Sequence, residues 1–181
     1  MIAAAALVVL TACKEKKQTQ EIIVPRQEVR KPGAPISMQV YKQSNDVKWN
    51  GKTYHIEIVR TPVDSLPMVK DEIGQKYVDN RIKLTISLQD SIIFYRKSFS
   101  KESFASYLDD DYYRNGILEA MIFEEVTDDK LSFAVSVAHP QADDEFIPLT
   151  MKLDRDKGLS IKRDNDIDTR GQGTEEEDDG V

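Results

Sequence analysis

Alternating apolar and polar residues form the clearest pattern in the chain. Between residues 81 and 88 the alternation is strict, so an extended strand would gather its aliphatic side chains on one face. Those side chains are Ile82, Leu84, Ile86 and Leu88. We expect this face to lie in the core with Phe133, Val135 and Val137, which come from a second alternating stretch at 130–138.

Turn sequences separate the alternating stretches. Asn50-Gly51 lies between 47–49 and 53–59 and is a strong signal for a two-residue hairpin, because both central positions need positive φ. Gly158, in the loop at 154–158, is expected to adopt the left-handed conformation. The other predicted strands cover 92–98, 117–125, 146–153 and 159–162. Most connections are too short for parallel crossovers, so the pattern predicts a mainly β fold, or α+β. We expect an antiparallel β-meander or partly open barrel of roughly seven to eight strands.

One short helix is predicted near 101–113. Phe104, Tyr107 and Leu108 follow helical spacing and would share one face. Ser100 is placed to cap the N-terminus, with Ser103 at the third helical position where a capping box usually has Glu. This helix would pack on the sheet or close the open side of a barrel.

Carboxylates near this helix are weak candidates for binding a metal. Asp109, Asp110 and Asp111 would lie near its C-terminal end, where negative charge opposes the helix dipole. Such a placement is either incidental or offset by a bound divalent cation. His55 and His139 are the only imidazoles, and two histidines do not supply the three or four convergent ligands of a zinc site. We expect both histidines to be paired surface residues rather than catalytic bases, and we predict no metal.

The first 13 residues have the order of a bacterial lipoprotein signal. The apolar run 2–10 is too short to span a bilayer, which takes roughly 20 apolar residues. It ends in Leu10, Thr11 and Ala12, the residues a signal peptidase would recognise, followed by Cys13, the only cysteine. Cys13 is therefore the predicted lipidation site and membrane anchor. The alternative is a buried apolar segment with an incidental cysteine.

Composition divides the rest of the chain. We expect a signal peptide at 1–12, the lipidated cysteine and a proline-broken tether at 13–37, one β-rich domain at 38–163, and a disordered acidic tail at 164–181. The tail holds eight acidic residues and one basic residue, and this difference accounts for the whole net charge of −7. Residues 1–163 are formally neutral, so nucleic acid is not an expected partner. The tail is expected to be solvated, without a binding role.

Three short segments resemble a family of small Bacteroidetes lipoproteins of unknown function. They are Asp79-Asn80-Arg81, Phe99-Ser100-Lys101-Glu102-Ser103-Phe104 and Ile117-Leu118-Glu119. The resemblance covers roughly 77–162 and implies a fold and a location at a membrane. It implies no catalytic residue, because the family brings none.

No catalytic motif stands out. A nucleophile elbow, a phosphate-binding loop and a dinucleotide fingerprint are all missing from the sequence. Six aromatic residues are numerous enough to line a groove, although their spacing is more typical of a core: Trp49, Tyr54, Phe94, Tyr95, Tyr112 and Tyr113. We therefore expect no cofactor and no enzymatic activity.

The sequence leaves three functions open. The first is a non-enzymatic binding module in the cell envelope, anchored through Cys13 and recognising an envelope protein or glycan. The second is a carrier of a small lipid-like or glycan molecule in a barrel cavity, and the third is a hydrolase with paired carboxylates. In lipoproteins of the kind that the chain resembles, an acidic cluster behind the acylated cysteine accompanies display on the cell surface. The matching segment here, Lys14-Glu15-Lys16-Lys17, is not acidic. We therefore expect an outer-membrane lipoprotein that faces the periplasm.

Overall fold

The fold consists of two antiparallel four-stranded sheets. The computed structural model describes residues 32–89, 91–140, 142 and 145–164. The first sheet has the order β1-β2-β5-β6 and the second the order β10-β9-β8-β7. The strands of the first sheet are β1 (Tyr41–Trp49), β2 (Lys52–Pro62), β5 (Asn80–Leu88) and β6 (Ile92–Phe99). Those of the second are β7 (Ile117–Thr127), β8 (Lys130–Ala138), β9 (Phe146–Leu153) and β10 (Leu159–Arg163).

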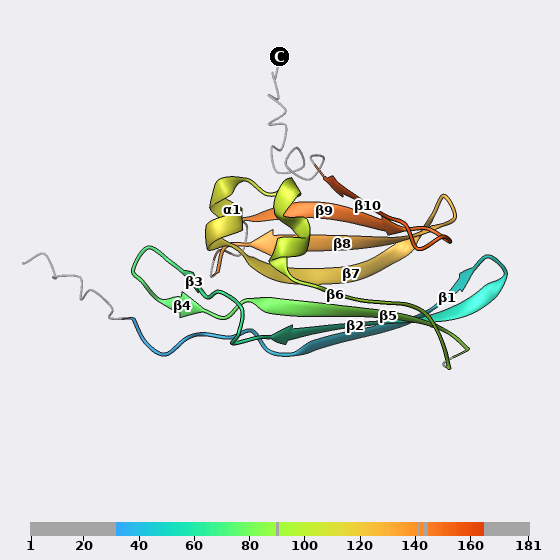
Figure 1. The fold of residues 1–181 in the computed structure, drawn as a ribbon, viewed down its shortest axis with the longest axis horizontal. Coiled ribbons are helices and arrows are strands. Elements are labelled where there is room, and N and C mark those ends of the chain that lie inside the picture. The colour runs from blue at the N-terminus through green and yellow to red at the C-terminus, as the bar shows by residue number, and fades with distance from the viewer. Residues whose placement is uncertain (1–31, 90, 141, 143–144, 165–181) are drawn as a thin grey trace, which may run out of the picture.

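Each sheet is a meander of neighbouring strands, and the two sheets form separate layers (Figure 1). Their facing sides meet in a single hydrophobic cluster with buried residues from seven of the long strands, and the partly buried Leu159 and Ile161 of β10 pack against it. The prediction of a mainly β, antiparallel meander is therefore confirmed. Within the described part of the chain the sheets do not close into a barrel.

The predicted strand faces and hairpin are confirmed. Ile82, Leu84 and Ile86 are fully buried, and Phe133 and Val137 oppose them from the second sheet in the same cluster. At the first hairpin, Asn50 and Gly51 both have positive φ, 53° and 73°, and Trp49 pairs with Lys52 across the turn. The side-chain period of two explains the buried face, because a register slip by one residue would expose it. The turn follows from the ability of Asn and Gly to adopt positive φ.

At β7 the two sheets are joined by hydrogen bonds from side chains of the first sheet, and not by backbone hydrogen bonds between strands. The Gln43 Oε1 atom accepts the backbone N–H of Phe123 at 3.0 Å, and the Arg60 guanidinium donates to the carbonyl of Glu119 at 2.5 Å. These bonds satisfy backbone groups on the free edge of β7. An edge occupied in this way is also protected from pairing with another chain.

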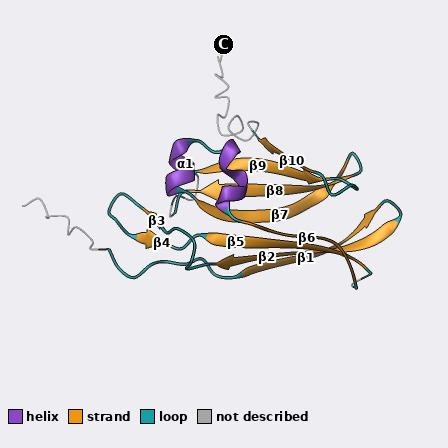
Figure 2. Ribbon diagram, in the orientation of Figure 1, coloured by secondary structure: helices purple, strands orange, loops and turns teal. Residues whose placement is uncertain are grey.

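The predicted helix at 101–113 is two helical segments. The first is the 3₁₀ helix η1 (Lys101–Tyr107) and the second is α1 (Asp110–Asn115). Figure 2 shows them beside each other at the end of the second sheet. The backbone between them is extended at Leu108 and at Asp109, whose side chain accepts the N–H of Tyr112 at 3.1 Å and so starts a new helix. The expectation of one continuous helix is wrong because Asp109 acts as an N-cap.

A two-stranded ribbon interrupts the first meander between β2 and β5. It consists of β3 (Val69–Lys70) and β4 (Lys76–Tyr77). The buried Gln75 side chain accepts the N–H of Gly33 at 2.7 Å and donates to the carbonyl of Ala34 at 2.8 Å. Ile36 forms a parallel bridge with Tyr77. These contacts hold residues 33–36 against the ribbon.

The loop between β9 and β10 corrects one turn prediction. Lys157, not Gly158, has the left-handed backbone, with φ of 67°. The Asp154 carboxylate accepts the N–H groups of Asp156 and Gly158 at 2.9 and 2.7 Å. A Cβ atom at Gly158 would lie 2.6 Å from the Asp154 Oδ2 atom. Glycine is therefore needed here for close approach to a carboxylate and not for positive φ.

Candidate functional site: a basic hollow on the second sheet

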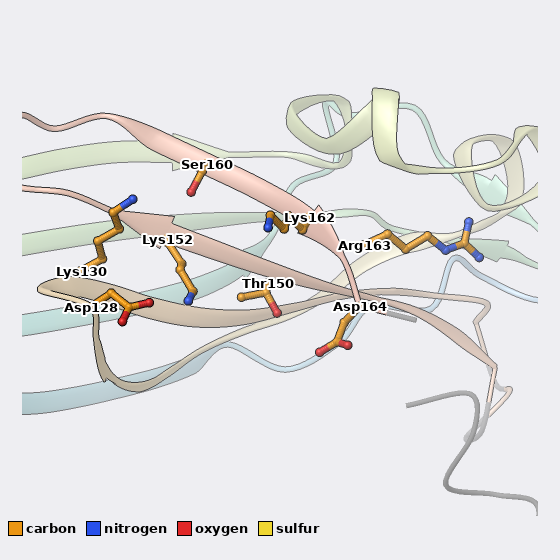
Figure 3. A pocket seen from close by; sticks show the side chains of 8 residues that line it. All are labelled: Asp128, Lys130, Thr150, Lys152, Ser160, Lys162, Arg163 and Asp164. Carbon is orange, nitrogen blue, oxygen red and sulfur yellow. The ribbon is translucent and has the colours of Figure 1, made fainter. Parts of the chain in front are cut away.

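The outer face of the second sheet carries a large, open hollow. Along β8 and β9, inward core residues alternate with outward ones, so the outward side chains form a surface of their own. The hollow has a volume of about 700 Å³ and is referred to below as the basic hollow. It is lined by Asp128, Lys130, Thr150, Lys152, Ser160, Lys162, Arg163 and Asp164 (Figure 3).

Strand register sets the positions of three lysines in the basic hollow. Lys152 on β9 pairs with Ser132 on β8 and with Ser160 on β10. Lys130 lies two residues before Ser132, and Lys162 two residues after Ser160. The three lysines therefore follow a diagonal across β8, β9 and β10. Diagonal neighbours in an antiparallel sheet are about 7–8 Å apart, which is the expected spacing from each lysine to the next.

The charges of the basic hollow are only partly balanced. Within the described part of the chain, no carboxylate lies within 4.0 Å of the ammonium groups of Lys130, Lys152 or Lys162. Arg163 does have a partner, Asp109, at 3.8 Å. Asp128 and Asp164 also line the hollow, so it is basic overall but not uniformly so. Three uncompensated ammonium groups in a row attract an anionic ligand.

An apolar hollow adjoins the basic one on the same face. It has a volume of about 200 Å³ and shares Thr150 and Asp164 with the basic hollow. Ile122 and Phe146 contribute to its lining and are 42% and 36% exposed. Ala120 and Ala134, also in the lining, carry small side chains. The outer face thus offers positive charge at one end and apolar contact at the other.

A buried polar cluster joins the two layers where β5 and β7 begin. Asp79 is only 4% exposed, and its Oδ1 atom accepts the N–H groups of Asn80 at 2.7 Å and Leu118 at 2.8 Å. The Asn80 amide donates to the carbonyl of Leu118 at 3.0 Å. The Lys101 ammonium lies 4.0 Å from Asp79 and donates to the carbonyl of Gly116 at 2.6 Å. We call Asp79, Asn80 and Lys101 the polar tie.

Burial dominates the titration of this cluster. It raises the pKa of the Asp79 carboxyl, while the N–H groups of Leu118 and Asn80 and the Lys101 ammonium oppose the rise. Burial also lowers the pKa of the Lys101 ammonium, against the attraction of Asp79 and Glu102. The geometry of the polar tie explains the joining of β5 to β7, and we assign it a structural role.

The acidic run beside the helices has a structural explanation. Asp109 caps α1, and Asp110 and Asp111 lie in its first turn, where carboxylates favour the positive end of the helix dipole. The expected conflict with the dipole is therefore wrong, and with it the argument for a compensating cation. Asp111 contacts His139 at 3.1 Å and Asp110 contacts Arg114 at 3.8 Å. Residues 32–164, apart from the few that are not described, contain no group of three His, Cys, Asp or Glu that could hold a metal.

The remaining candidates fall into three groups. His55 contacts Asp46 at 2.7 Å on the outer face of the first sheet, so it is paired on the surface as expected. Trp49 and Tyr54 are buried and meet Phe94 edge to face, so these three belong to the core. Tyr95 and Tyr112 also pack against the core, whereas Tyr113 is exposed. Leu10, Thr11, Ala12 and Cys13 lie outside the described residues.

Comparison with known proteins identifies the domain but not its role. A family model described as a domain of unknown function, DUF4738, matches residues 21–161. The chain belongs to the DUF4738 family. Residues 79–81, 99–104 and 117–119, which carry the resemblance, all lie within the matched range, and three of them meet in the polar tie. No curated protein matches the DUF4738 chain. None of its described helices is long and apolar enough to cross a membrane.

The diagonal of lysines is a feature that sequence reasoning missed. Each lysine lies at an ordinary outward position of a strand, and nothing distinguishes Lys130, Lys152 and Lys162 in the printed sequence. Only the registers of two strand pairs bring them into line. A signal was present in the alternation of 146–153 and 159–162, which places Lys152 and Lys162 outward once the inward residues are known.

Proposed function

We propose that this DUF4738 protein is a membrane-anchored bacterial lipoprotein whose domain is a non-enzymatic binding module in the cell envelope. In this proposal the basic hollow recognises an acidic, extended segment of an envelope protein. The observation that carries the proposal is the diagonal of Lys130, Lys152 and Lys162, none of which has a carboxylate partner among the described residues.

The spacing of the lysines suits an extended peptide. Successive residues of a strand rise by about 3.3 Å, and side chains on one side recur every second residue, at roughly 6.6 Å. Carboxylates at alternate positions of an extended segment would therefore match lysines that are about 7–8 Å apart. The adjoining apolar hollow, with Ile122 and Phe146, offers contact for a flanking apolar residue. Charge would set the register and apolar contact would add affinity.

The anchoring part of the proposal is supported by residues 1–13. The apolar run, the small residues before Cys13 and the lone cysteine together support a lipidated N-terminus, and the resemblance to small Bacteroidetes lipoproteins agrees with it. We propose an outer-membrane location with the domain facing the periplasm. Acyl chains on Cys13 would hold the module at the membrane, since two or more chains anchor a protein stably.

The packing of the domain interior favours a module that binds a partner on its surface, and not a carrier that holds a small molecule inside. A carrier needs an enclosed apolar cavity of about 300 Å³ or more. Here, large buried side chains such as Trp49, Phe99, Phe104 and Phe133 fill the space between the sheets. Two hollows lined mainly by apolar residues measure about 200 and 210 Å³ and open at the surface.

The test measures binding of a defined acidic peptide to the full chain in nonionic detergent. The probe is a fluorescent peptide of alternating glutamate and threonine, and its control replaces glutamate by glutamine. The variant Lys130→Gln, Lys152→Gln, Lys162→Gln should weaken binding by roughly three- to a hundredfold, because exposed ion pairs contribute about 0.2–1 kcal/mol each. Added salt should also weaken the binding of the peptide to the wild type, because it screens the charges of the lysines and glutamates.

A matched variant separates the hollow from net charge. Lys48, Lys83 and Arg96 are exposed, and lie on the first sheet. Changing all three to glutamine removes the same charge from the opposite layer and should leave the affinity within about twofold of the wild type. Equal affinities for the two triple variants, or equal binding of the glutamate and glutamine peptides, would refute recognition by the basic hollow.

A further inference from the structure

We infer that the acidic run Glu175–Asp179 of the same chain, which composition alone predicts to be solvated and without a binding role, occupies the basic hollow and competes with the external partner. This inference rests on the proposed preference of the hollow for acidic, extended segments. It adds a regulatory contact to that function, because the domain would carry its own competitor.

Charge complementarity is the first argument. All of the chain's net charge of −7 comes from residues 164–181, whereas residues 1–163 are formally neutral. The three lysines of the diagonal have no carboxylate partner among the described residues. The densest acidic segment of the chain therefore lies on the C-terminal side of the strand that carries Lys162, after the eleven residues 164–174.

The connecting length is the second argument. Asp164 lines the basic hollow, and its N–H donates to the carbonyl of Pro148 at 2.9 Å. From Asp164 to Glu175 is eleven residues, with Gly171 and Gly173 among them. A flexible chain of that length has an end-to-end distance of roughly 17–20 Å. Lys152 lies level with Ser160, four residues back along β10, or about 13 Å from Asp164. The acidic run can reach the diagonal without stretching.

The pattern within the run is the third argument. In an extended conformation Glu175, Glu177 and Asp179 would project to the same side. Their spacing of roughly 6.6 Å from one to the next is the spacing that suits Lys162, Lys152 and Lys130. The segment thus has the three alternate carboxylates that the hollow requires of an external ligand.

Attachment makes this weak interaction effective. A linker of eleven residues would hold the acidic run at a local concentration in the millimolar range. Contacts between exposed charges are weak, so an external acidic peptide and the internal run compete on similar terms. The internal run would then raise the apparent dissociation constant of the external peptide by about two- to tenfold, and salt would reduce this effect.

The experiment neutralises the run in the full chain with Glu175→Gln, Glu177→Gln and Asp179→Asn. Two quantities are measured. One is the set of backbone amide shifts of Thr150, Lys152 and Ser160 by NMR, and the other is the affinity for the peptide of alternating glutamate and threonine. We expect the shifts to differ from the wild type at low salt and to converge at high salt. The affinity should rise by about two- to tenfold.

The control removes three other acidic charges. Asp46, Asp64 and Glu72 lie outside the second sheet, and Asp46→Asn, Asp64→Asn, Glu72→Gln should leave the shifts of the hollow and the affinity unchanged. Shifts that respond equally to both triple variants, or to neither, would overturn the inference. A peptide that binds the wild type and the tail variant equally would also overturn it and leave the proposed function standing. If the shifts change as expected but no variant binds the peptide, the internal contact stands and the proposed function fails.

Discussion

The Asp79 carboxylate accepts the backbone N–H of Leu118 at 2.8 Å, and this bond joins the start of β5 to the start of β7. The neighbouring Asn80 amide donates to the carbonyl of the same residue at 3.0 Å. Both backbone groups of Leu118 are therefore satisfied by side chains from the other sheet. The polar tie does at this point what a backbone ladder would do in a closed barrel.

The polar tie predicts a difference between two substitutions of Asp79. Asp79→Ala would leave the buried N–H groups of Leu118 and Asn80 without their acceptor. We expect the free energy of unfolding to fall by about 2–5 kcal/mol, since each unsatisfied buried group costs roughly 1–3 kcal/mol. Asp79→Asn keeps an oxygen acceptor and should cost less. Denaturant unfolding of both variants checks this, and equal losses would show that the acceptor role is not what matters.

The same residue predicts how stability depends on pH. Burial raises the pKa of the folded-state Asp79 carboxyl above its ordinary value of 3.8, so between the two values the folded state holds a proton that the unfolded state has lost. The contribution of Asp79 to stability is therefore fully present below pH 3.8 and falls as the pH rises through the folded-state pKa. The stability of the wild type minus that of Asp79→Asn should decrease over this window. Parallel pH profiles for the two proteins would contradict the prediction.

The core face of β5 gives a second prediction. Ile86 is fully buried at the centre of its strand, opposite Ile56. Ile86→Ala should lower the free energy of unfolding by about 2–5 kcal/mol, as expected for a large-to-small change in a core. Thr85, the next residue, points to the outer face and is only half-buried. Thr85→Ala should change stability by less than about 1 kcal/mol, and similar losses at the two positions would contradict the assigned strand face.

Local patterns account for the parts of the fold that the sequence predicts. The faces of β5 and β8 follow from strict alternation, and the Asn50-Gly51 turn from the backbone freedom of two residues. The helix prediction failed where a local choice competed with periodicity. Phe104, Tyr107 and Leu108 continue a helical pattern, but the Asp109 side chain binds the Tyr112 N–H and restarts the helix. Asp is a common N-cap, so this signal was present in the sequence and was outweighed by the spacing.

The candidate site depends on long-range relationships that a single sequence does not contain. Lys130, Lys152 and Lys162 align only because two strand pairs have a particular register. Asp79 and Leu118 meet only because the two sheets stack with the starts of β5 and β7 together. Asp79, Asn80 and Lys101, which lie in the segments of the resemblance, meet Leu118 and Gly116 in the polar tie, and this contact joins the two sheets.

The anchoring proposal predicts the behaviour of one substitution. Cys13→Ser removes the thiol that would accept the lipid. The protein should move from the membrane pellet to the soluble fraction, or stay unprocessed with its first 12 residues attached. Fractionation and the mass of the intact protein distinguish these two forms from an acylated wild type. A Cys13→Ser protein that is processed and pelleted like the wild type would show that the cysteine is not the anchor.

The proposed periplasmic orientation predicts protection from proteases in intact cells. The segment 14–37 contains Pro25, Pro32 and Pro35, and residues 171–181 are rich in glycine and acidic residues, so both are expected to be open to cleavage where a protease can reach them. In unbroken cells a protease such as proteinase K should leave the chain intact, because the outer membrane excludes it. After the outer membrane is opened, cleavage in these segments should release the β-rich domain.

A surface protein serves as the positive control for protease activity and a periplasmic protein as the control for membrane integrity. Loss of the domain from unbroken cells would place it on the cell surface, and the acidic partner of the basic hollow would then have to lie outside the cell.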